Sequence, residues 1–292
     1  MNQSFGKIDL HMHTMVSDGT DTPEEILLRV KEAGIGLFSV TDHDAIKGCA
    51  IVQSCAKAGD PAFITGVEFS CKDEEGQYHI LGYGYDPEKP SMREAVEAGH
   101  ALRVGKLQKR LDFLENRFGF VFSERDIAKL FALDNPGKPH VGNLMVKYGY
   151  ALTKESAIRD YLNQYHAGSD YIRPEDAIQA ILAADGIPVL AHPSYGRGDE
   201  IILGSEMDRR LQKLIRFGLQ GVEAFYSGFT PKLREEILAF AEKYALFVTA
   251  GSDYHGQNKL VQLGETGFSR EMEYPQGLLR FLEAAETRIF RP

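Results

Sequence analysis

Residues 7–13 read KIDLHMH, a short apolar stretch that ends in two histidines. In a β-strand, residues two apart face the same side, so His11 and His13 point together while the residues beside them pack behind. Asp253 and His255 repeat this spacing near the end of the last predicted strand. Two such pairs are hard to explain as histidines that only satisfy hydrogen bonds in a core. The spacing therefore predicts a metal site.

Other histidines and acids lie at or beside the ends of further apolar stretches. The sequence predicts seven strands, over residues 7–13, 37–42, 63–70, 79–85, 187–192, 221–226 and 246–253. The expected metal ligands are His11, His13, Asp18, His43, Glu68, His79, His192, Asp253 and His255, of which Asp18 lies in the loop after the first strand. Imidazoles and carboxylates suit Zn, Mn or Fe, and this set exceeds the three or four protein ligands that one catalytic ion takes. It predicts two or three ions and hydrolysis of a phosphate ester.

The order of the predicted elements favours one α/β domain with an insertion. Helical patterns follow most strands, the clearest over residues 22–33, 174–184, 206–217 and 231–244. Strand-then-helix order predicts a mainly parallel sheet, closed or open. Residues 91–169 interrupt the alternation of strands and helices, because they contain a long amphipathic helix, a turn at 134–137 and a further helical stretch. We therefore expect residues 1–90 and 170–292 to build one barrel and residues 91–169 to form a helical insert.

Composition excludes several classes of protein. The chain of 292 residues is 43% hydrophobic and lacks the roughly 20-residue apolar run of a membrane helix. No secretory signal is seen at the N-terminus, so a cytoplasmic protein without a membrane partner is expected. Three cysteines without CxxC spacing argue against disulfides, including one to a partner, and against a thiolate zinc site.

The charge of the chain is uneven. A net charge of −9 is unfavourable for gripping long nucleic acid. Residues 103–147, however, hold nine Lys or Arg against five Asp or Glu, so this segment carries +4 and the remainder −13. We expect the basic insert to attract an anionic substrate, with Lys138 and His140 as candidates for gripping a phosphate. Arg197, in the glycine-rich loop after His192, is a third candidate.

Taken in order, the motifs resemble those of the PHP (polymerase and histidinol phosphatase) domain, a family of metal-dependent phosphoesterases. The resemblance rests on His11-Met12-His13 with Asp18, Thr41-Asp42-His43, Glu68, His79, Ala191-His192-Pro193 and Ser252-Asp253-Tyr254-His255. The chain is most similar to the branch whose helical insert carries an Arg-Pro-His-type motif, here Lys138-Pro139-His140. That branch includes nucleotide and oligonucleotide phosphohydrolases. Lysine in place of arginine weakens bidentate phosphate binding, because an ammonium acts as a point charge.

The resemblance implies a distorted seven-stranded (β/α) barrel that holds three divalent ions. It assigns His11, His13, Glu68 and Asp253 to the first ion, Glu68, His79 and His192 to the second, and Asp18, His43 and His255 to the third. Glu68 would then bridge the first two ions. A hydroxide shared by those ions is expected to attack phosphorus in line, with Glu68, His192 and Asp253 as the catalytic residues among the ligands. The identity of the ions, whether Mn, Zn or Fe, is left open.

These features favour a phosphoesterase that acts on a small phosphorylated metabolite, such as a nucleoside monophosphate, a nucleoside bisphosphate or a cyclic phosphodiester. An insert of this size would roof the pocket and select short substrates. Trimming of short RNA oligonucleotides from the 5′ end is the main alternative. Carbon–nitrogen hydrolysis is a second, because amidohydrolase barrels also carry HxH on their first strand. A noncatalytic metal-stabilised module is a third.

Overall fold

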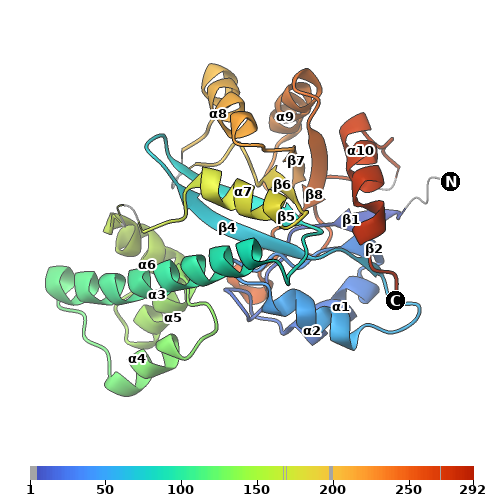
Figure 1. Cartoon of the computed structure of the whole chain (residues 1–292). Helices are drawn as coiled ribbons and strands as arrows, with labels where there is room; N and C mark the ends of the chain where they lie inside the picture. The colour runs from blue at the N-terminus through green and yellow to red at the C-terminus, as the bar shows by residue number, and fades with distance from the viewer. Residues whose placement is uncertain (1–4, 167, 169, 197–199, 270) are drawn as a thin grey trace.

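A computed structural model of the chain describes residues 5–166, 168, 170–196, 200–269 and 271–292. In these residues the strands form two sheets (Figure 1). The first sheet has the order β1-β2-β3, with strands Lys7–Asp9, Ile35–Phe38 and Ala62–Phe63. The second has the order β4-β5-β6-β7-β8, with strands Gly66–Lys72, Gln77–Tyr83, Ile187–Leu190, Gly221–Tyr226 and Phe247–Gly251.

The predicted α/β class is confirmed, but the strand count of seven is not. Residues 63–70 were expected to form one strand, whereas they contribute to β3 in the first sheet and β4 in the second. Strands β1 and β2, β2 and β3, β6 and β7, and β7 and β8 pair in parallel. Strand β5 is antiparallel to both β4 and β6. A short turn from β4 to β5 leaves no room for a crossover helix, so these two strands form a hairpin.

The two sheets meet through the segments that follow their strands. The backbone N–H of Leu10 donates to the carbonyl of Ala250 over 2.8 Å, and Met12 forms an isolated parallel bridge with Tyr254. At the other edge, the segment after β2 forms a parallel bridge between His43 and Glu68. These contacts bring together residues far apart in sequence, and each of them lies beside predicted metal ligands.

Helices cover the outside of the sheets, as Figure 1 shows. They are α1 (Pro23–Glu32), α2 (Lys47–Cys55), α7 (Pro174–Ala183), α8 (Gly204–Arg216), α9 (Pro231–Lys243) and α10 (Gln276–Ala285). Helix α1 starts as predicted, with a proline in its first turn and a capping box between Thr22 and Glu25. Short 3-10 turns cover Leu162–Gln164, Gly256–Asn258 and Glu286–Arg288. None of the described helices is both long and apolar enough to span a bilayer.

Four further helices gather at one side of the molecule (Figure 1). They are α3 (Pro90–Phe118), α4 (Glu124–Phe131), α5 (Lys138–Lys147) and α6 (Lys154–Asp160). Helix α3 ends at Gly119, which takes the left-handed conformation, with φ of 70°, that a glycine C-cap adopts readily. The leucines Leu107, Leu111 and Leu114 of α3 pack with residues of the other three helices in a separate apolar cluster. This group therefore has its own small core, distinct from the core around the sheets.

Candidate metal centre

The buried carboxylate of Glu68, on β4, lies at the centre of a ring of histidines. A ring nitrogen of each of five histidines lies within 3.3 Å of this carboxylate. Oxygen Oε2 faces His11, His13 and His43, at 3.3, 3.1 and 3.2 Å, and Oε1 faces His79 and His192, at 2.9 and 3.3 Å. The five histidines come from four separate segments of the chain, because His11 and His13 share one. The fold thus gathers most of the predicted ligands around the residue expected to bridge two ions.

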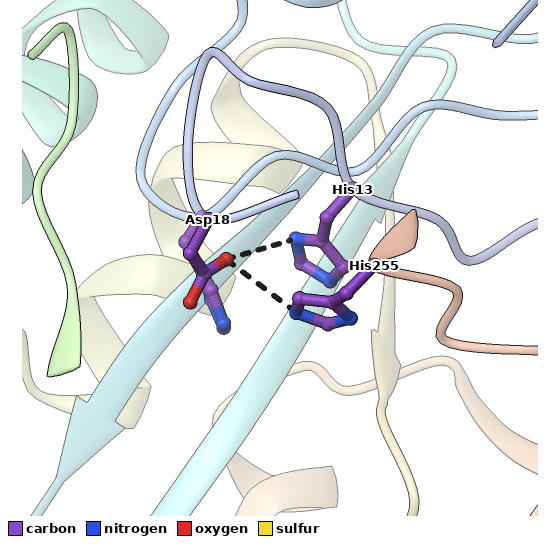
Figure 2. Close-up of side chains that lie close together, drawn as sticks. His13, Asp18 and His255 are labelled. Carbon is purple, nitrogen blue, oxygen red and sulfur yellow. Dashed lines mark ion pairs between the residues drawn. The ribbon is translucent and has the colours of Figure 1, made fainter. Parts of the chain in front are cut away.

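Two aspartates complete the cluster. Asp18 points toward the rings of His13 and His255 (Figure 2), with Oδ1 3.8 Å from His13 Nδ1 and 3.4 Å from His255 Nε2. Oxygen Oδ1 of Asp253 lies 3.6 Å from His11, 3.4 Å from His13 and 3.3 Å from His255. All nine predicted ligands therefore lie in one connected cluster.

The donor atoms of this cluster fit divalent cations. Within the described part of the chain, His11 Nε2, His13 Nε2 and Asp18 Oδ1 are buried without a hydrogen-bond partner. Buried polar atoms are rarely left in this state unless an ion or water completes them. The arrangement also forms three groups whose ligand atoms lie within 4.8 Å of one another: His13, Asp18, His43 and His255; His11, His13 and Asp253; and His43, Glu68 and His79. Imidazole nitrogen and carboxylate oxygen are ligands that Zn, Mn and Fe accept.

These groups only partly follow the ligand sets that the resemblance implied. His13 belongs to two of them, and His43 joins Glu68 and His79 as well as Asp18. His192 belongs to none of the three, although its Nε2 lies 3.3 Å from Glu68. The structure thus places all nine residues together without separating them into the three expected sets.

Opposing charges set the protonation of the buried carboxylates. Burial alone would raise the pKa of Glu68, but His43, His79 and His11 hold it well below its usual range. Burial likewise acts to raise the pKa of Asp253, and Lys259 and His11 lower it well below its usual range. Both carboxylates are therefore ionised, which is the form that binds metal.

Glu223, on β7, holds two of the histidines in place. Its Oε1 accepts from Nδ1 of His11 over 2.9 Å, and its Oε2 accepts from the backbone N–H of His192 over 2.8 Å. The side chain is fully buried. Histidines that bind metal commonly donate their other nitrogen to a carboxylate in this way, which fixes the ring and its tautomer. From the sequence alone, Glu223 is as compatible with packing in the core as with lining the pocket.

We expect Glu223→Gln to weaken metal binding about 10- to 100-fold, the usual effect of losing a carboxylate that orients a ligand. Glutamine keeps the volume, but its amide NH₂ must face one of the two donors, His11 Nδ1 or the His192 N–H. Metal affinity measured by competition with a chelator checks this. The exposed Glu235→Gln on α9 is the matched control, and equal affinities in the two variants would contradict the role.

Acids next to a metal-binding histidine can accept from its ring and orient it, so the sequence leads us to expect this role for Asp42 and Asp44 beside His43. Asp42 accepts from the N–H and hydroxyl of Thr14, at 2.8 and 2.7 Å, and from Ser17 Oγ at 2.7 Å. Asp44 accepts from Ser70 N–H and Arg103 Nε, both at 3.0 Å. In the described residues neither bonds to the His43 ring, so that expectation is wrong. Asp42 instead shapes the loop that leads to Asp18.

Two ligand positions have unusual backbone geometry. His192 has φ of 28° and Asp253 has φ of 57°, in the left-handed region that non-glycine residues rarely adopt. Such residues cost on the order of 1–3 kcal/mol and cluster at functional sites. The fold therefore tolerates strain at two positions of the ligand cluster.

A pocket of about 540 Å³ opens onto the cluster. Its lining joins Glu68, His79, His192 and other cluster residues to cations from α3 and α5, namely Arg103, Lys106, Arg110 and Lys138, and to Lys259 after β8. The basic segment that the sequence singled out therefore faces the ligands. Lys259 donates to Tyr226 OH over 2.9 Å and forms a close ion pair with Asp253.

The three predicted phosphate-binding residues have different positions. Lys138 lines the pocket, and its Nζ donates to Asn163 Oδ1 over 2.9 Å. His140 is not among the described lining residues; its Nδ1 accepts from the N–H of Gly137 over 2.9 Å at the start of α5. Arg197 lies outside the described residues.

Sequence reasoning missed Arg103, Lys106 and Arg110 as individual pocket residues. Their spacing of three and four residues was a usable signal, because it places them on one face of the predicted long helix. The face that turns toward the pocket follows only from the packing of α3.

Comparison with known proteins places the chain among metal-dependent phosphoesterases. The model of the PHP domain family matches residues 9–226. A 5′-3′ exoribonuclease from Haemophilus influenzae is 29% identical over 264 residues, which cover 89% of this chain and 93% of that protein. A 3′,5′-nucleoside bisphosphate phosphatase from Chromobacterium violaceum is 27% identical over 300 residues and 99% of each chain.

A solved structure shares the architecture of the whole chain. An amidohydrolase from Chromobacterium violaceum, with bound sulfate and no metal, superposes with a TM-score of 0.80 over 98% of each chain at 26% identity. The family model spans most of the chain and includes Glu223 and seven of the nine predicted ligands, those from His11 to His192. The chain therefore belongs to the PHP domain family.

Proposed function

We propose that this chain is a metal-dependent phosphoesterase that hydrolyses a small phosphorylated nucleoside. The observation that carries the proposal is a single pocket lined both by residues of the ligand cluster and by cations, namely Arg103, Lys106, Arg110, Lys138 and Lys259. The names of the two relatives describe action on RNA and on a nucleoside bisphosphate. A phosphate ester in this pocket would contact the ligand cluster and the cations together. Amide hydrolysis gives no reason for several cations opposite the cluster.

We further propose that three divalent ions bind, with the nine clustered residues as their protein ligands and Glu68 shared between two of them. Bound divalent ions would supply charge neutralisation at phosphorus and a water acidic enough to react near neutral pH. Residues 91–169 act as an insert domain that supplies one wall of the pocket to the barrel of residues 1–90 and 170–292.

Residues of the chain would bind the substrate and keep the metal-binding side chains in position. Lys259 lies against Asp253 and Tyr226 at the edge of the pocket, where its ammonium would neutralise a phosphate oxygen. Lys138 adds a cation from α5. Glu68, His192 and Asp253 keep the ligand geometry that catalysis requires, since each contacts other members of the cluster.

A panel of phosphate esters tests the proposed function. Purified protein with Mn or Zn bound is incubated with nucleoside mono- and bisphosphates, cyclic phosphodiesters and an N-acyl amino acid. Released phosphate, the phosphomonoester formed by ring opening of a cyclic diester, and released amine are measured. Hydrolysis of at least one nucleoside phosphate ester is the expected result. Turnover of the amide alone, with metal verified bound, overturns the proposal.

Trimming of short RNA from its 5′ end is the second candidate. It is favoured by the exoribonuclease relative, which spans 89% of this chain. Comparing turnover of a mononucleotide with that of a 5′-phosphorylated pentanucleotide separates the two functions, because a nuclease releases mononucleotides from the longer substrate.

Asp18→Asn tests the proposed number of ions. Asp18 belongs to just one of the three ligand groups, so a neutral amide there weakens one ion and leaves the ligands of the others in place. We expect bound metal to fall by about one equivalent, as measured by elemental analysis of protein dialysed against a weak chelator. Asp112→Asn on the exposed face of α3 is the control. Loss of all metal, or of none, would contradict three separable sites.

A further inference from the structure

The proposed insert, residues 91–169, meets the barrel beside one group of predicted ligands. This group, called the Asp18 group below, has ligand atoms within 4.8 Å of one another and consists of His13, Asp18, His43 and His255 (Figure 2 shows three of the four). Other ligands have partners inside the barrel: Glu223 accepts from His11 and from the backbone of His192, and Lys259 pairs with Asp253. The Asp18 group receives contacts from three parts of the insert, namely the turn after α4, helix α3 and helix α6.

The turn between α4 and α5 contacts two members of the Asp18 group. Asn135 is only 1% exposed, and its Nδ2 donates to the backbone carbonyl of His43. Gly137 lies so close to Asp18 that a Cβ there would be 3.2 Å from Oδ2 of the aspartate. A side chain at position 137 would crowd this carboxylate, so the turn packs directly against the ligand.

Helix α3 reaches the ring of His43 through Ser70 on β4. A terminal nitrogen of Arg103 donates to Ser70 Oγ over 2.9 Å, and its Nε donates to Asp44 Oδ2 over 3.0 Å. The same hydroxyl of Ser70 lies 3.4 Å from Nδ1 of His43. The insert therefore holds His43 at its backbone carbonyl and, through one intervening hydroxyl, at its ring.

Helix α6 contacts the turn that follows His255. Lys154 Nζ donates to the backbone carbonyl of Asn258 and lies 3.4 Å from its Oδ1. Asn258 Nδ2 in turn donates to the backbone carbonyl of Asp18 over 2.8 Å. Asn258 thus joins the loop that carries Asp18 to the turn after His255, and Lys154 fastens both to the insert.

We propose that the insert completes one metal site of the cluster, with Asn135 and Lys154 as positioning residues for the ion that the Asp18 group holds. The inference rests on the proposed binding of three ions. Contacts that orient metal ligands from outside usually account for about 10- to 100-fold in affinity. Because the ion and the docked insert favour the same arrangement, each should strengthen the binding of the other. The wall of the pocket and this part of the metal centre are therefore coupled.

Stepwise competition with a chelator tests the proposal by measuring the affinity of each ion in the full chain, with Mn or Zn as the probe and no substrate. Lys154→Met keeps the apolar stem and removes the donor to Asn258, and Lys154→Arg supplies a donor again. Asn135→Ala removes the donor to His43. Lys109→Met is the matched control, because it breaks another ion pair between the insert and the barrel, the one with Asp170.

We expect Lys154→Met to weaken one ion about 10- to 100-fold and the other two less than about threefold. Asn135→Ala should weaken at least the same ion, because His43 belongs to two ligand groups. Lys154→Arg should recover most of the affinity, and Lys109→Met should match the wild-type chain. Hydrogen exchange should be slower in the metal-loaded than in the metal-free chain over residues 134–140 and 255–260, and this protection should shrink in Lys154→Met.

Unchanged affinities in both Lys154→Met and Asn135→Ala, or an equal loss for all three ions, would overturn the inference. So would the absence of metal-dependent protection in both segments when three ions are bound. A wild-type chain that binds no metal contradicts the proposed function itself, whereas a wild-type chain that binds three ions regardless of these contacts contradicts only the coupling to the insert.

Discussion

Glu68→Gln should lower kcat/KM by about a thousandfold and reduce bound metal in the same preparation. The carboxylate faces five histidines from both of its oxygens, so one change alters the site for more than one ion. Metal ions contribute several kcal/mol of transition-state stabilisation, and about 1.36 kcal/mol corresponds to a factor of ten. Glutamine has nearly the same shape, so the loss reports charge and coordination rather than packing.

Steady-state kinetics and elemental analysis on the same samples check this expectation. The exposed Glu242→Gln on α9 controls for the loss of one negative charge elsewhere in the protein. Circular dichroism shows whether the variant is folded. A Glu68→Gln protein that has lost its metal and retains wild-type turnover would refute the role of the cluster in catalysis.

Local spacing was enough to predict most of the ligand cluster. His11 and His13 alternate with Leu10 and Met12, which are fully buried, so the two-residue period of an extended chain places both rings on one side. Asp253 and His255 repeat the spacing at the other end of the chain. Extended segments that pair side by side then bring the two motifs together, through the bridge of Met12 and Tyr254. Composition and period determine the two motifs without knowledge of the fold, whereas their pairing is seen only in the structure.

Contacts that depend on register between distant strands could not be predicted. Glu223 bonds to His11 across 212 residues, and this contact requires β7, β8 and the segment after β1 to be neighbours. An acid in an apolar stretch has no local signal that separates this role from an ordinary buried pair. The division of residues 63–70 between two sheets could not be predicted either. A short apolar run has no change of period that would indicate where one strand ends and the next begins.

The basic insert illustrates the same limit at a larger scale. Its excess of Lys and Arg predicts an anionic partner, and its periodicity before the turn at 134–137 predicts the long helix. Which cations face the pocket depends on how α3 is rotated about its axis, and one contact that constrains this rotation is the close approach of Gly99 to Asp44, where a side chain would collide. The sequence therefore indicated the charge of the wall, and the packing identified Arg103, Lys106 and Arg110.

Removal of metal should lower the melting temperature by about 15–30 °C if three ions bind. An ion that binds only the folded chain stabilises it by about 2.7 kcal/mol at a hundred times its dissociation constant. A change of 1 kcal/mol shifts the melting temperature by about 2–4 °C in chains of comparable size. One ion thus predicts a shift of about 5–10 °C, and three predict more. We expect the ions to stabilise the folded chain because His11 Nε2, His13 Nε2 and Asp18 Oδ1 are buried and have no hydrogen-bond partner among the described residues.

Differential scanning calorimetry of chelator-treated protein, with and without Mn or Zn, measures this shift. Calcium at the same ionic strength is the control, because it prefers oxygen ligands and should not restore stability at a histidine-rich site. The metal-dependent gain should shrink as the pH falls from 8 to 6, since the imidazoles must be deprotonated to bind. Asp18→Asn should retain part of the gain and Glu68→Gln very little, because Glu68 faces five ring nitrogens and Asp18 faces two. An equal gain in both variants would mean that the stabilising ions bind elsewhere.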